Sequence, residues 1–340
     1  MAKLSNKWYE FTVNSGMVTH TGSNFMYCLN LANIPLTGFW SEISSAANLG
    51  IDDYATGLTL PRVVKHLDIP ARKGLLYFDA PISSTKKFRL YYGSSVAQLD
   101  SAAAFTNSNI SNFLPLCETS GTTMYNVGAN QGTLIPPAAL SATGKIYRSI
   151  VGSGPAASSV KFNDQIFGAG NVTISATVYV NGYGPFAAGF GYVCGNGKMS
   201  VFIKTDQKIY VRRDGATSAI SAASFIAGNW YNVTVTSTNA GVTNVYCNGV
   251  LSGTADQSAG APVAGLGNGY IANSVTEASA WDGNIEQFMH ASDIKSTTWI
   301  ATQYQMLFNN AIFFTGFVAK TGFINPCVFT FTECMKLNGY

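Results

Sequence analysis

The acidic residues whose spacing comes closest to a catalytic arrangement are Glu277, Asp282 and Glu286. Two carboxyl groups held about 5–9 Å apart can hydrolyse a glycosidic bond, one as the acid and one as the nucleophile or base. On one strand this requires acidic residues at i and i+2 or i+4 that face the same groove. Here the Asp282-Gly283 turn interrupts the set, and the tight Glu-x-Asp-x-Glu spacing is missing. We therefore expect Asp282 and Glu286 to form a turn and anchor a strand, and we expect no enzymatic activity.

Histidine and glycine motifs give no further catalytic candidate. His20, His66 and His290 have no His, Asp or Glu neighbour at the spacing of metal ligands. The chain has no Gly-x-Ser-x-Gly nucleophile turn and no Gly-x-x-x-x-Gly-Lys-Ser/Thr phosphate loop. The sequence therefore predicts no catalytic residue and no cofactor-binding residue.

An aromatic, glycine-rich segment at residues 181–192 is the best candidate for a binding surface. Its rings are those of Tyr183, Phe186, Phe190 and Tyr192. Rings exposed on the rim of a β-sandwich can stack on the C–H face of a sugar or contact a protein partner. The same rings can instead fill a core or a subunit interface, and the sequence leaves both interpretations open.

The composition predicts the fold class. Only 11% of residues are charged, and 34 glycines, 17 tyrosines and 21 phenylalanines accompany many Ser, Thr and Asn residues. Short strands joined by tight turns need this composition. The net charge of +3 is dispersed along the chain, whereas binding to a phosphate backbone needs a coherent basic surface. We predict an all-β protein that does not bind nucleic acid.

The termini and the cysteines indicate the cellular setting. No stretch approaches the ~20 apolar residues of a membrane span, and the first ten residues lack the apolar region of a signal peptide. We expect no membrane partner and synthesis in the cytoplasm. Most of the six cysteines are expected to be buried thiols. A bridge between Cys327 and Cys334 stays open.

Apolar alternation and turn signals divide the chain into four parts. Residues 1–105 read as an N-terminal β-sandwich module, and the polar residues 106–112 read as a linker. Residues 113–318 read as a second, larger sandwich. Residues 319–340 form an apolar terminal strand that either completes a sheet of its own chain or docks on a neighbouring subunit.

The second module resembles the laminin-G/concanavalin-like jelly roll. The resemblance is carried, in order, by the run Leu116–Leu134, Phe162-Asn-Asp164, Trp230-Tyr231-Asn-Val, Tyr246-Cys-Asn-Gly249, Asp282-Gly-Asn-Ile-Glu286 and the helix-like Thr297–Leu307. In the fourth piece, Asn248-Gly249 supplies the positive-φ positions of a type I′ hairpin turn. The resemblance implies a two-sheet sandwich, and it leaves open a calcium ion at the rim held by Asp164 and Asp282.

The first module is similar to a bacterial and phage domain of unassigned function that often precedes laminin-G-like domains. The matching pieces are Trp8-Tyr9, Phe39-Trp40, Asp52-Asp53, Leu60-Pro61, Ile82–Thr85 and Leu90-Tyr-Tyr-Gly-Ser94. The two resemblances together imply adhesion-type modules of the kind found on virion surfaces.

These observations support one leading interpretation. The chain is expected to be a non-enzymatic structural protein of a bacteriophage virion (capsid decoration, head fibre or tail surface), with weak glycan binding as a further expectation. Its partners would be other virion proteins or copies of itself, bound through residues 319–340, and host-surface glycans. The alternative is a secreted or cell-surface bacterial adhesin of the lectin type. A glycan-cleaving enzyme is the third interpretation, and the carboxylate spacing disfavours it.

Overall fold

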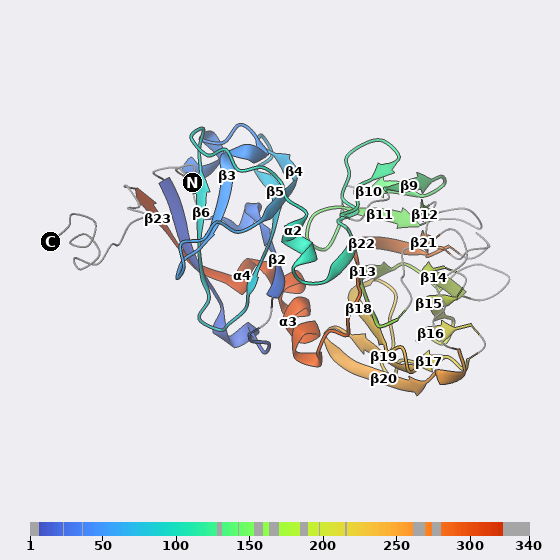
Figure 1. Cartoon of the computed structure of the whole chain (residues 1–340). Helices are drawn as coiled ribbons and strands as arrows, with labels where there is room; N and C mark the ends of the chain where they lie inside the picture. Colours follow the sequence, from blue (N-terminus) through green and yellow to red (C-terminus); the bar gives the residue numbers. More distant parts are fainter. Residues whose placement is uncertain are drawn as a thin grey trace.

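The computed structural model describes residues 7–22, 24–35, 37–127, 131–141, 143–152, 159–162, 170–183, 190–196, 198–214, 216–260, 269–273 and 280–321. These residues form two units, each built from two β-sheets, with helices α2 and α3 near their junction (Figure 1). The predicted all-β class is confirmed. None of the described helices is long and apolar enough to span a membrane.

The N-terminal sandwich combines a four-stranded and a three-stranded antiparallel sheet. The first has the order β23-β1-β6-β3 and the second the order β2-β5-β4. The strands are β1 (Lys7–Val13), β2 (Asn24–Asn30), β3 (Leu49–Asp53), β4 (Arg62–Asp68), β5 (Lys73–Pro81), β6 (Lys87–Tyr92) and β23 (Phe314–Thr321). A short helix, α1 (Thr37–Ser41), lies between β2 and β3.

Aromatic side chains fill the gap between these two sheets. Alternate residues of a strand point to the same face, so Tyr9, Phe11 and Val13 of β1 are all buried. The ring of Phe88 on β6 lies with its centroid 5.0 Å from that of Tyr27 on the opposite sheet. Such offset and edge-on contacts add to the apolar burial that holds the sheets together.

The second unit is a larger sandwich. One sheet has the order β10-β11-β22-β13-β18-β19-β20, with β7 also pairing with β22, and the other has the order β17-β16-β15-β14-β21-β12-β9-β8. The strands of the first sheet are β7 (Ile110–Leu114), β10 (Ala139–Ser141), β11 (Ser149–Gly152), β13 (Val172–Val180), β18 (Asn229–Ser237), β19 (Val242–Cys247), β20 (Val250–Asp256) and β22 (Gly283–Ala291). Those of the second are β8 (Thr123–Met124), β9 (Gly132–Ile135), β12 (Ser159–Phe162), β14 (Phe190–Gly195), β15 (Met199–Lys204), β16 (Ile209–Arg213), β17 (Ala219–Ile220) and β21 (Gly269–Ile271).

The region expected to be a linker, residues 106–112, is shared between the end of helix α2 and the start of strand β7. Helix α2 (Ala103–Thr106) packs under β5, and β7 joins the jelly-roll sheet by pairing Leu114 with Phe288 and Ile110 with Ala291. Ile110 is completely buried. The jelly-roll sheet therefore starts within the polar stretch, at residue 110.

The chain returns to the N-terminal sandwich after the jelly roll. The predicted helical segment forms α3 (Thr297–Phe308), capped by Ser296, and is followed by α4 (Asn310–Phe313). Strand β23 then pairs with β1 from Lys7↔Thr321 to Val13↔Phe314. The boundary expected at residues 318–319 thus falls inside a strand of the N-terminal sandwich, and residues 322–340 lie outside the described residues.

The core of the N-terminal sandwich extends across the junction to helix α3 and the adjacent face of the jelly roll, whereas the interior of the jelly roll forms a second core of its own. Trp299 of α3 packs against Phe25 of β2 with ring centroids 5.2 Å apart, and the Cys28 amide donates to the Met306 sulfur at 3.0 Å. Buried residues of both units belong to one cluster, which also includes Met289 of β22. This packing fixes one sandwich against the other.

Candidate functional site

The structure places two of the four predicted aromatic residues within the sandwich wall. The Tyr183 hydroxyl donates to the Phe225 carbonyl at 3.0 Å and accepts from the Ala227 amide at 2.8 Å. Tyr192 is 7% exposed, and burial raises the pKa of its hydroxyl. Phe186 lies outside the described residues, and Phe190 is placed only as the first residue of β14. Glycan contact by these residues stays a prediction.

Of the two predicted calcium ligands, only Asp282 lies in the described part of the chain, so the calcium site stays a prediction. Asp164 lies outside the described residues. The Asp282 carboxylate accepts a hydrogen bond from the Asn181 side-chain amide at 3.0 Å. The backbone carbonyl of Asp282 accepts another from the Asn181 backbone amide at 2.9 Å. Among the described residues no three His, Cys, Asp or Glu side chains gather as a metal site. Asp282 here ties the β13 end to the start of β22.

Glu286 is buried and held by hydrogen bonds from a neighbouring loop. Its side chain is completely buried, and its carboxylate accepts from the backbone amides of Lys145, Ile146 and Tyr147 at 2.5, 2.9 and 2.7 Å. Burial raises the pKa of Glu286 to about 7, although these amide hydrogen bonds act in the opposite direction. The carboxylate therefore holds the 145–147 loop against β22, as an anchoring residue would.

The cysteines of the described residues are free thiols. Cys28, Cys117 and Cys194 are buried, and Cys247 is half-buried. Burial raises the pKa of Cys28 to about 12 and that of Cys247 to about 11, and a thiol with such a pKa is a poor nucleophile near neutral pH. Cys327 and Cys334 lie outside the described residues.

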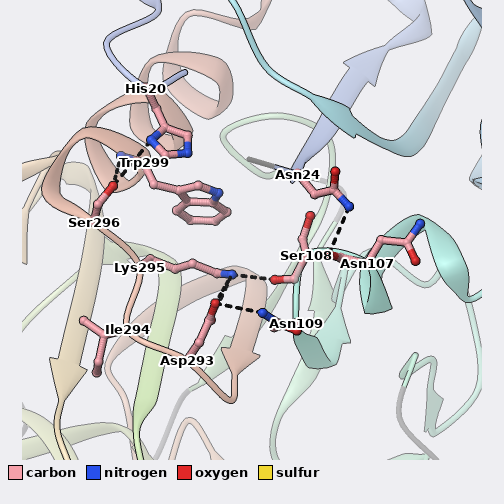
Figure 2. Close-up of a pocket in the computed structure, with 10 residues that line it drawn as sticks. All are labelled: His20, Asn24, Asn107, Ser108, Asn109, Asp293, Ile294, Lys295, Ser296 and Trp299. Atoms are coloured by element: carbon pink, nitrogen blue, oxygen red, sulfur yellow. Dashed lines mark hydrogen bonds and ion pairs between the residues drawn. The ribbon is translucent and has the colours of Figure 1, made fainter. Parts of the chain in front are cut away.

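A polar pocket of about 230 Å³ lies at the junction of the two sandwiches, and we call it the junction pocket. Figure 2 shows the lining residues, which come from four segments of the chain. The N-terminal sandwich, the α2–β7 turn, the β22–α3 connection and helix α3 supply them: His20, Asn24, Asn107, Ser108, Asn109, Asp293, Ile294, Lys295, Ser296 and Trp299.

Local hydrogen bonds hold the β22–α3 wall of this pocket in place. The Thr173 hydroxyl on β13 donates to the Asp293 carbonyl at 2.7 Å and accepts from the Lys295 amide at 3.0 Å. The Ser296 hydroxyl accepts from the Trp299 amide at 3.1 Å, as expected of a helix N-cap. Ser296 therefore acts as a structural group that starts α3 at the pocket wall.

An ion pair between buried Lys295 and Asp293, whose side chain is 37% exposed, forms the floor of the junction pocket. The Lys295 ammonium lies 2.9 Å from the Asp293 carboxylate and also donates to the Ser108 carbonyl. The Lys295 side chain is only 7% exposed. The Asn109 side-chain amide donates to the same carboxylate at 3.0 Å. The Asp293 carboxylate compensates the charge of the buried Lys295 ammonium, which is the usual condition for burying a charge.

Two further groups define the chemistry of the pocket. Burial, together with the charge of Lys295, lowers the pKa of His20, so its ring is neutral at neutral pH. The Trp299 indole nitrogen is buried and has no hydrogen-bond partner, and Figure 2 shows it on the side of the ring that faces Asn24 and Ser108. The pocket thus offers donors and acceptors, no net charge and no activated nucleophile.

A second hollow of about 380 Å³ lies beside the β4–β5 turn. Its lining is His66, Leu67, Asp68, Ile69, Pro70, Thr119 and Tyr147. None of these side chains carries a buried polar atom without a partner. The junction pocket is therefore the better candidate for a specific ligand.

None of the residues of the junction pocket was singled out from the sequence as a site residue. Its walls come from segments up to 279 positions apart, from His20 to Trp299. Only the polar stretch 106–112 gave a local signal, and such a stretch indicates a linker as readily as a pocket wall. A pocket of this kind depends on how two domains pack.

Comparison with known proteins supports the nature of the second unit. Residues 153–301 match a laminin-G-type family described as the concanavalin A-like lectin/glucanases superfamily. No curated protein matches the chain.

Solved structures give a more distant likeness. A Trypanosoma rangeli sialidase bound to 2,3-difluoro-KDN has 13% sequence identity and a TM-score of 0.45, covering 58% of this chain and 33% of that one. The binding domain of botulinum neurotoxin serotype G has 14% identity and a TM-score of 0.45, with 58% and 51% covered. The serotype D ligand-binding domain in complex with N-acetylneuraminic acid has 14% identity and a TM-score of 0.44, with 60% and 52% covered.

The chain spans about a third to a half of the length of these solved structures, and all three TM-scores lie below 0.5. None of their properties therefore extends to this chain. The family match is more specific, and the two eight-stranded sheets agree with it. The chain contains a concanavalin A-like jelly-roll domain of the laminin-G type over residues 153–301.

Proposed function

We propose that this chain is a non-enzymatic structural protein displayed on the surface of a bacteriophage particle, with the N-terminal sandwich attached to the particle and the jelly roll outermost. It would be made in the host cytoplasm and assembled onto the particle through other virion proteins or copies of itself. Binding of host-surface glycans by the jelly-roll side is a secondary part of the proposal.

The observation that carries this proposal is the pairing of β23 with β1. It brings the last described strand to the edge of the N-terminal sandwich, at the end of the molecule far from the jelly roll (Figure 1). Most β23 residues are exposed, including Val318 at 48%. An exposed edge strand can add a strand from a partner. Attachment at this edge would leave the jelly roll free.

The structural role of the Glu286 carboxylate supports the proposed absence of enzymatic activity. This carboxyl group lies on β22 in the sequence motif nearest to a catalytic set, and three backbone amides occupy its oxygens. A carboxylate held in this way cannot approach a substrate. The proposal therefore assigns the jelly roll to display and contact.

Mass spectrometry of density-purified particles tests the proposal. We expect the chain in the particles, in a fixed ratio to the other virion proteins, and absent from the host envelope and the medium. Recovery on the cell surface or in the medium, with none in the particles, would favour the adhesin alternative and contradict the proposal.

A further inference from the structure

We propose that the junction pocket binds a single neutral sugar ring, held between the indole nitrogen of Trp299 and the oxygen atoms of Asn24 and Asp293. This inference does not depend on particle attachment, because it rests only on the described residues of the pocket.

The charges of the pocket favour a neutral ligand. Lys295 and Asp293 form an ion pair at 2.9 Å, so neither presents an uncompensated charge to the pocket. His20 is neutral because burial and Lys295 lower its pKa. For an anion or a cation in the pocket, attraction by one member of this pair is offset by repulsion from the other, so neither gains net Coulomb energy to repay the loss of its hydration. A ligand with hydroxyl groups meets neither penalty.

The Trp299 indole supplies a donor that needs an acceptor. Trp299 is 2% exposed, and its indole nitrogen has no partner, although the indole N–H is a donor. Leaving such a buried donor unpaired is unfavourable, because the N–H has given up its hydrogen bond to water without gaining another. A ligand hydroxyl oxygen in the space that this nitrogen faces would accept its hydrogen (Figure 2). The other tryptophan buried to this degree, Trp281, already donates from its indole nitrogen to the Tyr179 carbonyl at 3.1 Å.

Acceptors for the hydroxyl hydrogens line the opposite side. The Asn24 side-chain amide donates to the Asn107 carbonyl at 3.2 Å, which orients the amide and leaves its oxygen as an acceptor. The Asp293 carboxylate accepts from Asn109 and Lys295, and its two oxygens offer about four acceptor positions in total. A hydroxyl group is both a donor and an acceptor of hydrogen bonds. Neighbouring hydroxyls on one sugar ring can therefore accept from the Trp299 indole nitrogen and donate to the oxygens of Asn24 and Asp293.

The volume sets the size of the ligand. A pocket of 230 Å³ corresponds to about eight water molecules at roughly 30 Å³ each. Pockets for drug-sized ligands are larger, about 300–1,000 Å³. A volume of 230 Å³ suits one pyranose ring. The pocket would therefore take a monosaccharide or the terminal ring of a glycan.

Indole N–H signals of the full chain labelled with ¹⁵N-tryptophan provide the test. The chain has five tryptophans, and Trp299→Phe assigns the signal of Trp299. The probes are D-glucose, D-galactose, D-mannose and N-acetyl-D-glucosamine, with glycerol as a control. We expect at least one sugar to shift the Trp299 signal saturably while the Trp281 signal stays in place.

Two variants locate the binding. We expect Trp299→Phe and Asn24→Ala each to weaken sugar binding at least tenfold, measured by saturation-transfer NMR, whereas Trp230→Phe on the jelly roll leaves it unchanged. Asn24 is partly exposed and decides the outcome if Trp299→Phe fails to fold. No saturable shift with any sugar, an equal shift with glycerol, or full binding by Asn24→Ala would overturn the proposal. Absence of the chain from phage particles would leave these results unaffected.

Discussion

The side-chain amide of Gln287 lies 3.0 Å from the Tyr77 hydroxyl oxygen, linking the jelly roll to the N-terminal sandwich through a fully buried hydrogen bond. Gln287 occupies a β-bulge of β22, where Thr177 pairs with Glu286 and Ala176 with Phe288. Its φ of 55° is in the left-handed region. The bulge turns the Gln287 side chain out of the jelly-roll sheet and towards β5, so an irregularity in one sandwich fastens it to the other.

We expect the Gln287–Tyr77 contact to contribute to the stability of the whole chain. Gln287→Ala should lower the free energy of unfolding by about 1–3 kcal/mol, because it leaves the Tyr77 hydroxyl buried without this partner. Tyr77→Phe removes the hydroxyl group that accepts this hydrogen bond. Urea unfolding of both variants and of the double variant gives the coupling energy. A coupling energy of zero would show that the contact does not join the sandwiches.

Glu286→Gln tests whether this carboxyl group is an anchor. The substituted amide would direct N–H groups towards the backbone amides of Lys145, Ile146 and Tyr147, so we expect a loss of about 1–3 kcal/mol in the free energy of unfolding. Chemical denaturation measures it. Wild-type protein should release no sugar from a panel of glycans. Hydrolysis by the wild type that Glu286→Gln abolishes, with stability unchanged, would contradict the account.

Asp79 predicts a pH dependence of stability. Asp79 is 2% exposed, and burial raises its pKa from 3.8 to about 7, while the hydrogen bond from Ser108 acts in the opposite direction. Between these pH values the folded state binds a proton that the unfolded state has released. The contribution of Asp79 is therefore fully present below about pH 4 and is lost as the pH rises through 7, by up to about 1.4 kcal/mol per pH unit.

The Asp79→Asn variant isolates this effect, because all other titrating groups cancel in the comparison. Relative to wild type, Asp79→Asn should become more stable as the pH rises from 5 to 8. Urea denaturation of both proteins at these two pH values measures the difference. A stability difference that stays constant, or that changes in the opposite direction, would show that Asp79 is charged in the folded protein.

Gly283 explains why the closing motif of the jelly roll contains glycine. Its φ is 145°, and a Cβ atom there would lie 1.9 Å from the Tyr179 carbonyl oxygen. We expect Gly283→Ala to lower the free energy of unfolding by about 3 kcal/mol or more, because strain and overlap add at one position. Gly38→Ala is the matched control, since a Cβ at Gly38 meets nothing within 4 Å. Thermal unfolding should separate the two, and an equal change in both would refute the explanation.

The sequence predicts local structure better than it predicts the site. Strand alternation, the Asn248-Gly249 turn and the helix at 297 depend on neighbouring residues, so the all-β class, the jelly roll and α3 could be read from them. The return of β23 to β1 joins residues some 300 positions apart and leaves no local signal. The junction pocket likewise depends on domain packing, which is why Asn24, Asp293 and Trp299 escaped notice.

The most direct test of the proposed display orientation is lysine labelling of intact particles compared with the isolated protein, read by mass spectrometry. Lys320 on β23 is exposed, and Lys198 on the jelly roll is 29% exposed. If the N-terminal sandwich is the attached end, Lys320 should be protected in the particle while Lys198 reacts as it does in the isolated protein. Protection of Lys198 with Lys320 still reactive, or no difference at either residue, would contradict the proposed orientation.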